Sequence, residues 1–318
     1  ESGSMVMLDV ATGEILAMVN QPSYNPNDAL ESTRGMRNRA VTDLYEPGST
    51  MKPLAVLAAL ESGQFERDTL IDTAPGYYRV GRDVVRGRNR GQITVETVLK
   101  KSSQVGIAKM AMALPDRAVF ELMSRGGVGE YLGTGLPGEV AGKLTDEGLQ
   151  RPIVRTTLAF GYGLAITPLQ LAEAYMTLAA GGVRRPVSIL RREGHSPGER
   201  VYDAELVAEL ISMMEGVTDS DGTAPGARIE GYRVAGKTGT IRKVGPNGYD
   251  DGRHGAWFAG IVPATRPRIV TVVLIDEPKG EEYEGGAVAG PVFGRVLTRA
   301  VHLLGVPPDD LQLAELNP

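Results

Sequence analysis

The sequence predicts an α+β fold in which strands from both ends of the chain form one antiparallel sheet and a helical segment fills the middle. Apolar runs typical of strands lie near the two termini, whereas apolar residues between them recur mostly at helical spacing. The chain has 318 residues, of which 42% are hydrophobic and 23% charged. These values are ordinary for a globular protein with one large core.

The strands are expected as two hairpins. Residues 5–10 and 14–19 are apolar runs around the turn signal ATGE, and residues 255–264 and 268–276 flank a proline-rich turn. Strands of both hairpins would lie in the same sheet, because a half-apolar strand needs neighbours and a covering layer to bury its apolar side.

Helices are expected in the middle of the chain and at its end. The periodic segments are residues 54–62, closed by Gly63, then 95–100, 105–113, 169–180, closed by Gly181, 204–215 and 292–304. We therefore expect one domain over residues 1–318, with a sheet part of roughly 1–30 and 230–318 and a mostly helical part of roughly 40–225. There is no internal repeat.

Composition argues against several classes of function. The net charge is −5 and the basic residues form only short clusters, which does not favour a nucleic-acid partner. The chain has no cysteine and three scattered histidines, so we expect no metal site and no cofactor. The longest apolar runs, at 54–60 and 269–275, are far shorter than the ~20 residues that span a bilayer.

Residues 231–240, GYRVAGKTGT, fit two different motifs. The first eight fit the phosphate-loop pattern G-x-x-x-x-G-K-[ST], which would indicate a nucleotide hydrolase. That loop must be followed by a helix, and the sequence after Lys237, TGTIRKVGPNG, is poor in helix formers. The last five residues contain K-T-G, which is typical of serine enzymes that react with penicillins.

Two serines lie in patterns that can mark a nucleophile. Residues 194–198, GHSPG, fit the nucleophile elbow G-x-S-x-G, but a proline and polar flanks favour a surface loop. Ser49 instead follows Pro47-Gly48 and precedes Pro53, which predicts a helix that begins near residue 49 or 50. The helix is apolar nearly all round from Leu54 onward, which predicts that it is buried.

Lys52 is three residues after Ser49, so both side chains would lie over the same face of the helix. A lysine can deprotonate a serine only when burial or a nearby cation lowers its pKa. Two further segments favour such a site. Ser102 lies between two predicted helices, where it could face a cleft, and Lys237 belongs to K-T-G, whose Gly239 would let a substrate backbone approach closely.

Together these segments resemble S-x-x-K, S-x-N and K-T-G of the penicillin-binding proteins and serine β-lactamases. The similarity extends over nearly the whole chain and resembles the transpeptidase domain of a class B penicillin-binding protein of the division-specific type. The stretches that carry it are MLDVATGEILAMVNQPSYNPN, RNRAVTDLYEPGSTMKP, TGLPGE, FGYGLAITPLQLAEAYMTLAAGG and AGKTGT. The resemblance implies the penicillin-binding/serine β-lactamase fold, with an all-helical insertion.

The resemblance also implies roles for individual residues. Ser49 would be the acylated nucleophile, Lys52 its base and Ser102 a proton relay to the leaving amine. The backbone N–H groups of Ser49 and Thr240 would form the oxyanion hole. Gln104, Lys237, Thr238, Gly239 and Thr240 would contact the substrate. Gln104 departs from the family pattern, because asparagine is usual there and glutamine is one methylene longer.

The implied function is D,D-transpeptidation of peptidoglycan stem peptides through a serine acyl-enzyme, in septal wall synthesis. The implied partners are a D-Ala-D-Ala donor, an amine acceptor, β-lactams as covalent inhibitors, and a glycan polymerase with division proteins. An N-terminal membrane anchor and a non-catalytic pedestal would precede this part, which would lie on the outer side of the inner membrane. Tyr249, Tyr283 and Gly285-Gly286 lie in segments that could border the cleft.

Two alternatives from the same family remain open, besides the nucleotide hydrolase. A serine β-lactamase would need a glutamate that activates water, and Glu121, Glu130 and Glu139 lie in no pattern that resembles that loop. A non-catalytic β-lactam sensor or scaffold would keep the acylation site as a receptor. Intact serine and lysine motifs favour an enzyme over the sensor.

Overall fold

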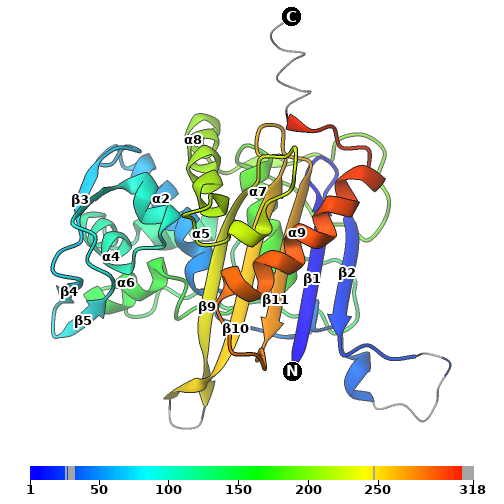
Figure 1. Cartoon of the computed structure of the whole chain (residues 1–318), viewed down its shortest axis with the longest axis horizontal. Coiled ribbons are helices and arrows are strands. Elements are labelled where there is room, and N and C mark those ends of the chain that lie inside the picture. The colour runs from blue at the N-terminus through cyan, green and yellow to red at the C-terminus, as the bar shows by residue number, and fades with distance from the viewer. Residues whose placement is uncertain (26, 28–32, 246–247, 310–318) are drawn as a thin grey trace, which may run out of the picture.

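The computed structural model describes residues 1–25, 27, 33–245 and 248–309. Its centre is a five-stranded antiparallel sheet in the order β2-β1-β11-β10-β9 (Figure 1). The strands are β1 (Ser2–Asp9), β2 (Ile15–Gln21), β9 (Ala235–Gly245), β10 (Gly248–Val262) and β11 (Ile269–Asp276). N-terminal strand β1 pairs with C-terminal strand β11, so the predicted α+β fold with a sheet from both chain ends is confirmed.

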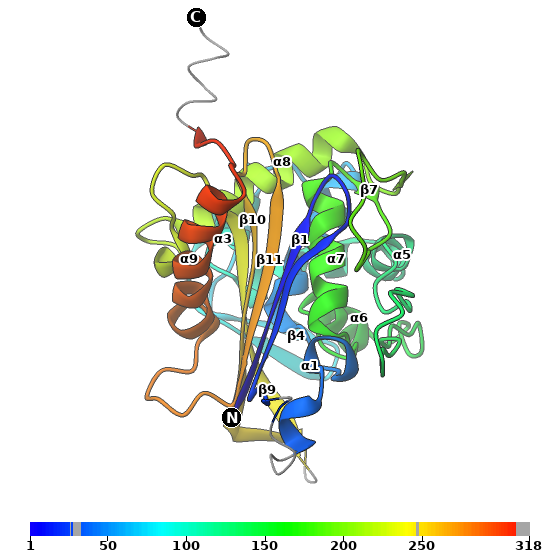
Figure 2. The ribbon, with the colours of Figure 1, turned by 90° about the vertical axis from the view of Figure 1, so that its right-hand side faces the viewer.

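The sheet is covered on both faces. Helix α9 (Gly285–Leu303) packs on β10 and β11 from one side, and α7 (Pro168–Ala179) packs on β1 and β11 from the other (Figure 2). Alternate residues of β11 therefore enter different cores, Val272 on the α7 side and Val273 on the α9 side. Two buried faces explain why this strand is apolar at nearly every position instead of at every second one.

The helical part lies beside the α7 face of the sheet (Figure 1). It contains α1 (Arg39–Thr42), α2 (Lys52–Glu61), α3 (Val95–Lys100), α4 (Gln104–Ala113), α5 (Ala118–Arg125), α6 (Pro152–Ala159) and α8 (Ala204–Glu215). Short 3-10 turns are η1 (Thr33–Met36), η2 (Gly48–Met51), η3 (Gly216–Thr218) and η4 (Pro225–Ala227). Helix α2 is buried from Lys52 to Leu60 and packs against α4, α5 and α8, as its apolar sequence predicts.

The insertion is mostly helical and not all-helical, which corrects one prediction. Short antiparallel pairs join β3 (Leu70–Asp72) to β6 (Gln92–Thr94), β4 (Tyr77–Val80) to β5 (Asp83–Arg86), and β7 (Val183–Arg184) to β8 (Glu199–Arg200). Each strand has two to four residues. A run of that length is too short to show a two-residue apolar period in the sequence.

One element start also differs from the prediction. The last helix begins at Gly285 instead of residue 292, because packing on the sheet outweighs the low helix propensity of its glycines and Pro291. Strand β9 begins at Ala235 and continues to Gly245, so the whole K-T-G motif lies inside it. In the described part of the chain, no helix has both the length and the apolar character needed to cross a bilayer.

Candidate active site

Ser49 lies in the tight turn η2, directly before the buried helix α2. Gly48 has a φ of +56°, a left-handed conformation that residues with a side chain rarely adopt. A Cβ at Gly48 would also lie 2.6 Å from Cγ2 of Ile241 on β9. Glycine is therefore required where β9 passes the turn. The Ser49 side chain is only partly buried, and its hydroxyl has no hydrogen-bond partner among the residues described.

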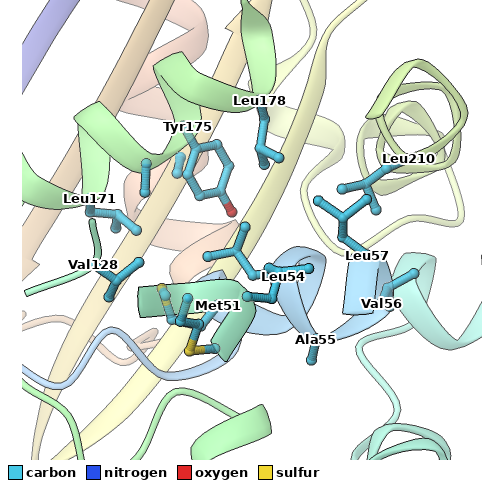
Figure 3. Packing of buried hydrophobic residues seen from close by; sticks show 14 of the residues in the cluster. Met51, Leu54, Ala55, Val56, Leu57, Val128, Leu171, Tyr175, Leu178 and Leu210 are labelled. Atoms are coloured by element: carbon cyan, nitrogen blue, oxygen red, sulfur yellow. The ribbon is translucent and has the colours of Figure 1, made fainter. Parts of the chain in front are cut away.

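The residue after Ser49 anchors the turn to the core. The Thr50 hydroxyl donates to the carbonyl oxygen of Pro47 at 2.8 Å, and the Tyr175 hydroxyl of α7 donates to the carbonyl oxygen of Thr50 at 2.7 Å. In Figure 3 the Tyr175 hydroxyl points toward the start of α2, where Met51 and Leu54 lie. These bonds hold the Ser49 backbone in place from both sides of the turn.

Lys52 is the first residue of α2 and is completely buried. Its Nζ donates to the hydroxyl of Ser102 at 3.0 Å and to the backbone carbonyl oxygen of Ser102 at 2.7 Å. No carboxylate forms an ion pair with it among the described residues. Burial, and secondly the charge of Lys237, hold the pKa of Lys52 well below its usual value. The lowered pKa favours the neutral amine form of Lys52, which can accept a proton.

Ser102 lies in the loop between α3 and α4 with a φ of +54°. A non-glycine residue in this region costs of order 1–3 kcal/mol, and such strain is typical of functional sites. Its neighbour Ser103 has a different role, since the Ser103 hydroxyl accepts from the Gly106 N–H at 3.1 Å and caps α4. The strained loop presents the Ser102 side chain to Lys52.

Lys237 is a second completely buried lysine, on β9. Its Nζ lies 3.2 Å from the carbonyl oxygen of Thr238, and burial lowers its pKa to about 7. The Thr238 hydroxyl donates to the hydroxyl of Thr223 at 3.2 Å, and the Thr240 hydroxyl accepts from the N–H of Gly285, the first residue of α9, at 3.0 Å. A row of polar groups therefore follows this stretch of β9.

Gly239 brings β9 against the turn that carries Ser49. A Cβ added at Gly239 would lie 3.0 Å from both the Pro47 carbonyl oxygen and Cγ2 of Thr50. Since η2 packs on β9 and the charge of Lys237 acts on Lys52, the structure brings Ser49, Lys52 and both ends of the K-T-G motif together.

Gln104 is the first residue of α4 and faces the same region. With Ser102 and Thr223 it lines a cavity of about 280 Å³, the Ser102 cavity, completed by Gly87, Arg88, Arg90, Lys101, Ser103 and Glu284. The longer glutamine is therefore accommodated beside Ser102, where the resemblance expects asparagine.

A bridge that the sequence does not predict joins the β9–β10 hairpin to the helical part. The Tyr249 hydroxyl of β10 donates to the Glu46 carboxylate at 3.0 Å, and the Gly163 N–H donates to the same carboxylate at 2.9 Å. Tyr162 meets the Tyr249 ring edge-on, with ring centres 5.9 Å apart, and Arg242 lies over that ring. The bridge ends three residues before Ser49. Of the residues in this bridge, only Tyr249 is among those that the sequence places in segments that could border the cleft.

The other cleft candidates have structural contacts. Tyr283 stacks on His254 with ring centres 4.2 Å apart. Gly285 and Gly286 begin α9 where a Cβ would lie within 2.4 Å of the carbonyl oxygens of Gly239 and Thr223 respectively. Their lack of side chains lets α9 start next to the Lys237 segment.

The two competing motifs lack their structural context. Lys237 is followed by a continuing strand and not by a helix, so the segment cannot cradle phosphates at a helix N-terminus. Residues 191–198 form a loop between β7 and β8, and the Ser196 hydroxyl there accepts from Arg192 at 2.6 Å. Neither a phosphate loop nor a nucleophile elbow is present.

Burial of an unpaired Lys237 predicts a stability cost. We expect Lys237→Met to raise the free energy of unfolding at pH 7 by about 1–4 kcal/mol, because a buried charge is replaced by an apolar chain. The Lys237 pKa falls from 10.5 to about 7 on folding, so the unfolded chain binds more protons between these values and wild-type stability rises with pH there. The stability advantage of Lys237→Met over wild type should therefore shrink as pH rises from 7 to 10.5. Urea unfolding at several pH values measures both free energies of unfolding.

Lys243 supplies a matched control on the same strand. Its Nζ pairs with Asp276 at 3.0 Å and with Glu277 at 2.9 Å, so Lys243→Met should destabilise the protein. If Lys237→Met also destabilised the protein at pH 7, the Lys237 charge would be compensated by a partner group. The description of Lys237 as a buried cation without an ion pair would then be wrong.

Comparison with known proteins identifies the family. The chain matches the family model for the penicillin binding protein transpeptidase domain over residues 3–298. It is 42% identical over 319 residues to the peptidoglycan D,D-transpeptidase FtsI of Escherichia coli K12, and 37% identical over 310 residues to the probable peptidoglycan D,D-transpeptidase PenA of Neisseria meningitidis. These alignments cover 100% and 97% of this chain but 54% and 53% of the relatives. The chain thus spans about half the length of the curated relatives that it matches.

Solved structures agree with this result. The apo structure of the TP domain from Burkholderia pseudomallei penicillin-binding protein 3 superposes with a TM-score of 0.87 at 35% identity, covering 97% of this chain and 90% of that one. The resemblance stated from the sequence is therefore confirmed. The chain belongs to the family of penicillin-binding protein transpeptidase domains.

Proposed function

We propose that this domain is a serine D,D-transpeptidase that cross-links peptidoglycan stem peptides. One observation carries the proposal. Lys52 is buried, has no carboxylate partner among the described residues, contacts the Ser102 hydroxyl, and lies one helical turn from Ser49. A lysine in these surroundings can deprotonate a serine at neutral pH, which an ordinary surface lysine cannot do.

In the acylation step, the Ser49 hydroxyl attacks the carbonyl carbon of the penultimate D-Ala and gives its proton to Lys52. The N–H groups of Ser49 and Thr240 hold the oxyanion, and each such donor is worth about 2.7–4 kcal/mol. Lys237 and Thr238 bind the terminal carboxylate of the donor, with Gly239 and Gln104 beside the peptide. The proton reaches the leaving amine through Ser102, so that the C–N bond breaks and D-Ala departs.

The acyl group on Ser49 then passes to an amine. The amine nitrogen bonds to the acyl carbon, the bond to Ser49 Oγ breaks, and the amine proton returns to Oγ through Ser102 and Lys52. Hydrolysis would need a carboxylate that activates water. The three candidate glutamates have other partners, because Glu121 contacts Arg117, Glu130 contacts Arg184, and Glu139 accepts from Thr134. This supports transfer over β-lactamase activity.

The same site would form a covalent adduct with β-lactams, since their strained amide resembles the donor and the three candidate glutamates are held by other partners. Relatives named FtsI support a role in septal wall synthesis, with a glycan polymerase and division proteins as partners of the longer protein. We place the domain on the outer side of the inner membrane, because peptidoglycan, its proposed substrate, lies there.

Two measurements test the proposal. Purified protein mixed with benzylpenicillin should gain one stable adduct by intact mass, and rapid turnover of the drug would instead indicate a β-lactamase. A stem-peptide donor mixed with an amine acceptor should yield a cross-linked product. An adduct without any cross-linked product would favour the sensor alternative.

A further inference from the structure

The amine of Lys52 lies over the ring of Phe160, the residue that directly follows α6. The distance from Lys52 Nζ to the ring centre is 5.9 Å, and Phe160 is buried. The hydrogen bonds of Nζ go to two oxygens of one residue, the hydroxyl and the backbone carbonyl of Ser102. The polar neighbours of this amine are therefore the Ser102 oxygens, and an aromatic face lies beside it.

The segment that carries Phe160 is fixed against the turn of the nucleophile. The N–H of Gly48 donates to the carbonyl oxygen of Gly161 at 3.0 Å, and a Cβ at Gly161 would lie 2.1 Å from the carbonyl oxygen of Gly48. Two residues later, the N–H of Gly163 donates to the Glu46 carboxylate at 2.9 Å. Phe160 thus lies between helix α6 and these backbone contacts, which fix its ring relative to Lys52.

A proton on Lys52 has no counter-ion in the described structure. No carboxylate pairs with Lys52 there, and no charge on α3, α4, α5, α6 or α8, which pack around α2, acts on it. The charge that does act is that of Lys237 on β9, which repels an ammonium group. Tyr175 of α7 stays neutral, because burial raises its pKa well above the usual value, and its hydroxyl donates to a backbone carbonyl.

An aromatic ring can stabilise a cation under these conditions. The negative face of its quadrupole attracts an ammonium group within about 6 Å, and the attraction is larger where water is excluded. A carboxylate in the same place would act differently, because it would keep the lysine protonated before the reaction and prevent it from acting as a base.

We propose that Phe160 is a positioning residue for Lys52, and that its ring stabilises the ammonium group that Lys52 becomes during acylation. The inference rests on the proposed function. As Ser49 Oγ bonds to the carbonyl carbon of the donor, the O–H bond breaks and the proton goes to Lys52 Nζ, so positive charge develops over the ring. A group that is already in place where charge develops lowers the barrier, because it need not reorganise.

Pentafluorophenylalanine at position 160 tests this role, because it keeps the ring while the fluorines withdraw electrons from the ring face. Phe160→Leu removes the ring altogether. Stopped-flow acylation with a chromogenic cephalosporin, measured over a range of pH, gives the rate. We expect the rising limb to move to lower pH by about one unit and the maximal rate to fall about threefold, since a less stabilised ammonium makes Lys52 a weaker base.

The profiles of the variants and of wild type should therefore cross, with the variants faster at acid pH and slower at the maximum. The falling limb, which Lys237 sets, should stay in place. A loss of packing alone would lower the rate equally at every pH. That result, or a rising limb that stays in place or moves to higher pH, would overturn the inference. If Phe160→Leu does not fold, the fluorinated ring decides.

Phe293→Leu and pentafluorophenylalanine at position 293 are the matched controls. Phe293 is completely buried and meets Phe258 with ring centres 4.8 Å apart, in the core on the α9 side of the sheet, whereas α2 belongs to the other core. Both limbs should keep their wild-type pH in these variants. A wild type without a rising limb would instead overturn Lys52 as the base in the proposed function, and this inference with it.

Discussion

Replacing Ser49 with alanine is expected to abolish the covalent penicillin adduct and to lower the rate of peptide transfer on the order of a million-fold. The reason is that the acyl-enzyme cannot form without the hydroxyl, and removal of a nucleophile from a serine enzyme has an effect of about this size. Intact-protein mass after incubation with benzylpenicillin measures the adduct. The fold should persist, because Ser49 is partly exposed and the turn is held by Thr50 and Tyr175.

Ser196→Ala provides the control for this experiment. Ser196 is the serine of the other nucleophile-like pattern, and its hydroxyl contacts Arg192 in a loop between β7 and β8. We expect Ser196→Ala to form the adduct as wild type does. If the adduct still formed in Ser49→Ala, a different side chain would be acylated. The assignment of Ser49 as the nucleophile would then be wrong.

Replacing Lys52 with methionine is expected to slow acylation about 10²–10⁴-fold, the usual contribution of a general base. Methionine has a similar length and no amine, so the buried site keeps its packing while Ser102 loses the donor that contacts it. Stopped-flow acylation with a chromogenic cephalosporin measures the rate. Lys100→Met is the control, because Lys100 pairs with Asp219 and Asp221 and does not line the Ser102 cavity, so acylation should be unchanged.

The pH dependence separates a base from a merely structural lysine. Burial and then the charge of Lys237 lower the pKa of Lys52, so wild-type acylation should rise with pH as Lys52 becomes neutral. It should fall again above about pH 7, where Lys237 loses the charge that binds the donor carboxylate. Lys52→Met should lose the rising limb and keep the falling limb. A variant that kept both limbs would exclude Lys52 as the base.

Much of the fold can be predicted from the sequence because its signals are local and strong. The apolar hairpins at the two ends, the buried helix after Ser49 and the stop at Gly63 all depend on residues within a few positions of one another. The short strands of the insertion and the first turns of α9 were missed, because their residues have weak local preferences and their conformation depends on contacts with distant segments.

For the candidate site, too, some features follow from the sequence and others depend on the tertiary structure. The sequence by itself determined which residues could carry the chemistry, since Ser49 with Lys52 and the K-T-G motif are short patterns. Only the tertiary structure decided that Lys52 contacts Ser102, that Lys237 is buried without a carboxylate, and that Arg88 and Arg90 line the cavity beside them. Burial and proximity between segments 50 to 190 residues apart are set by packing, and packing is what shifts the pKa of a lysine enough for it to act as a base.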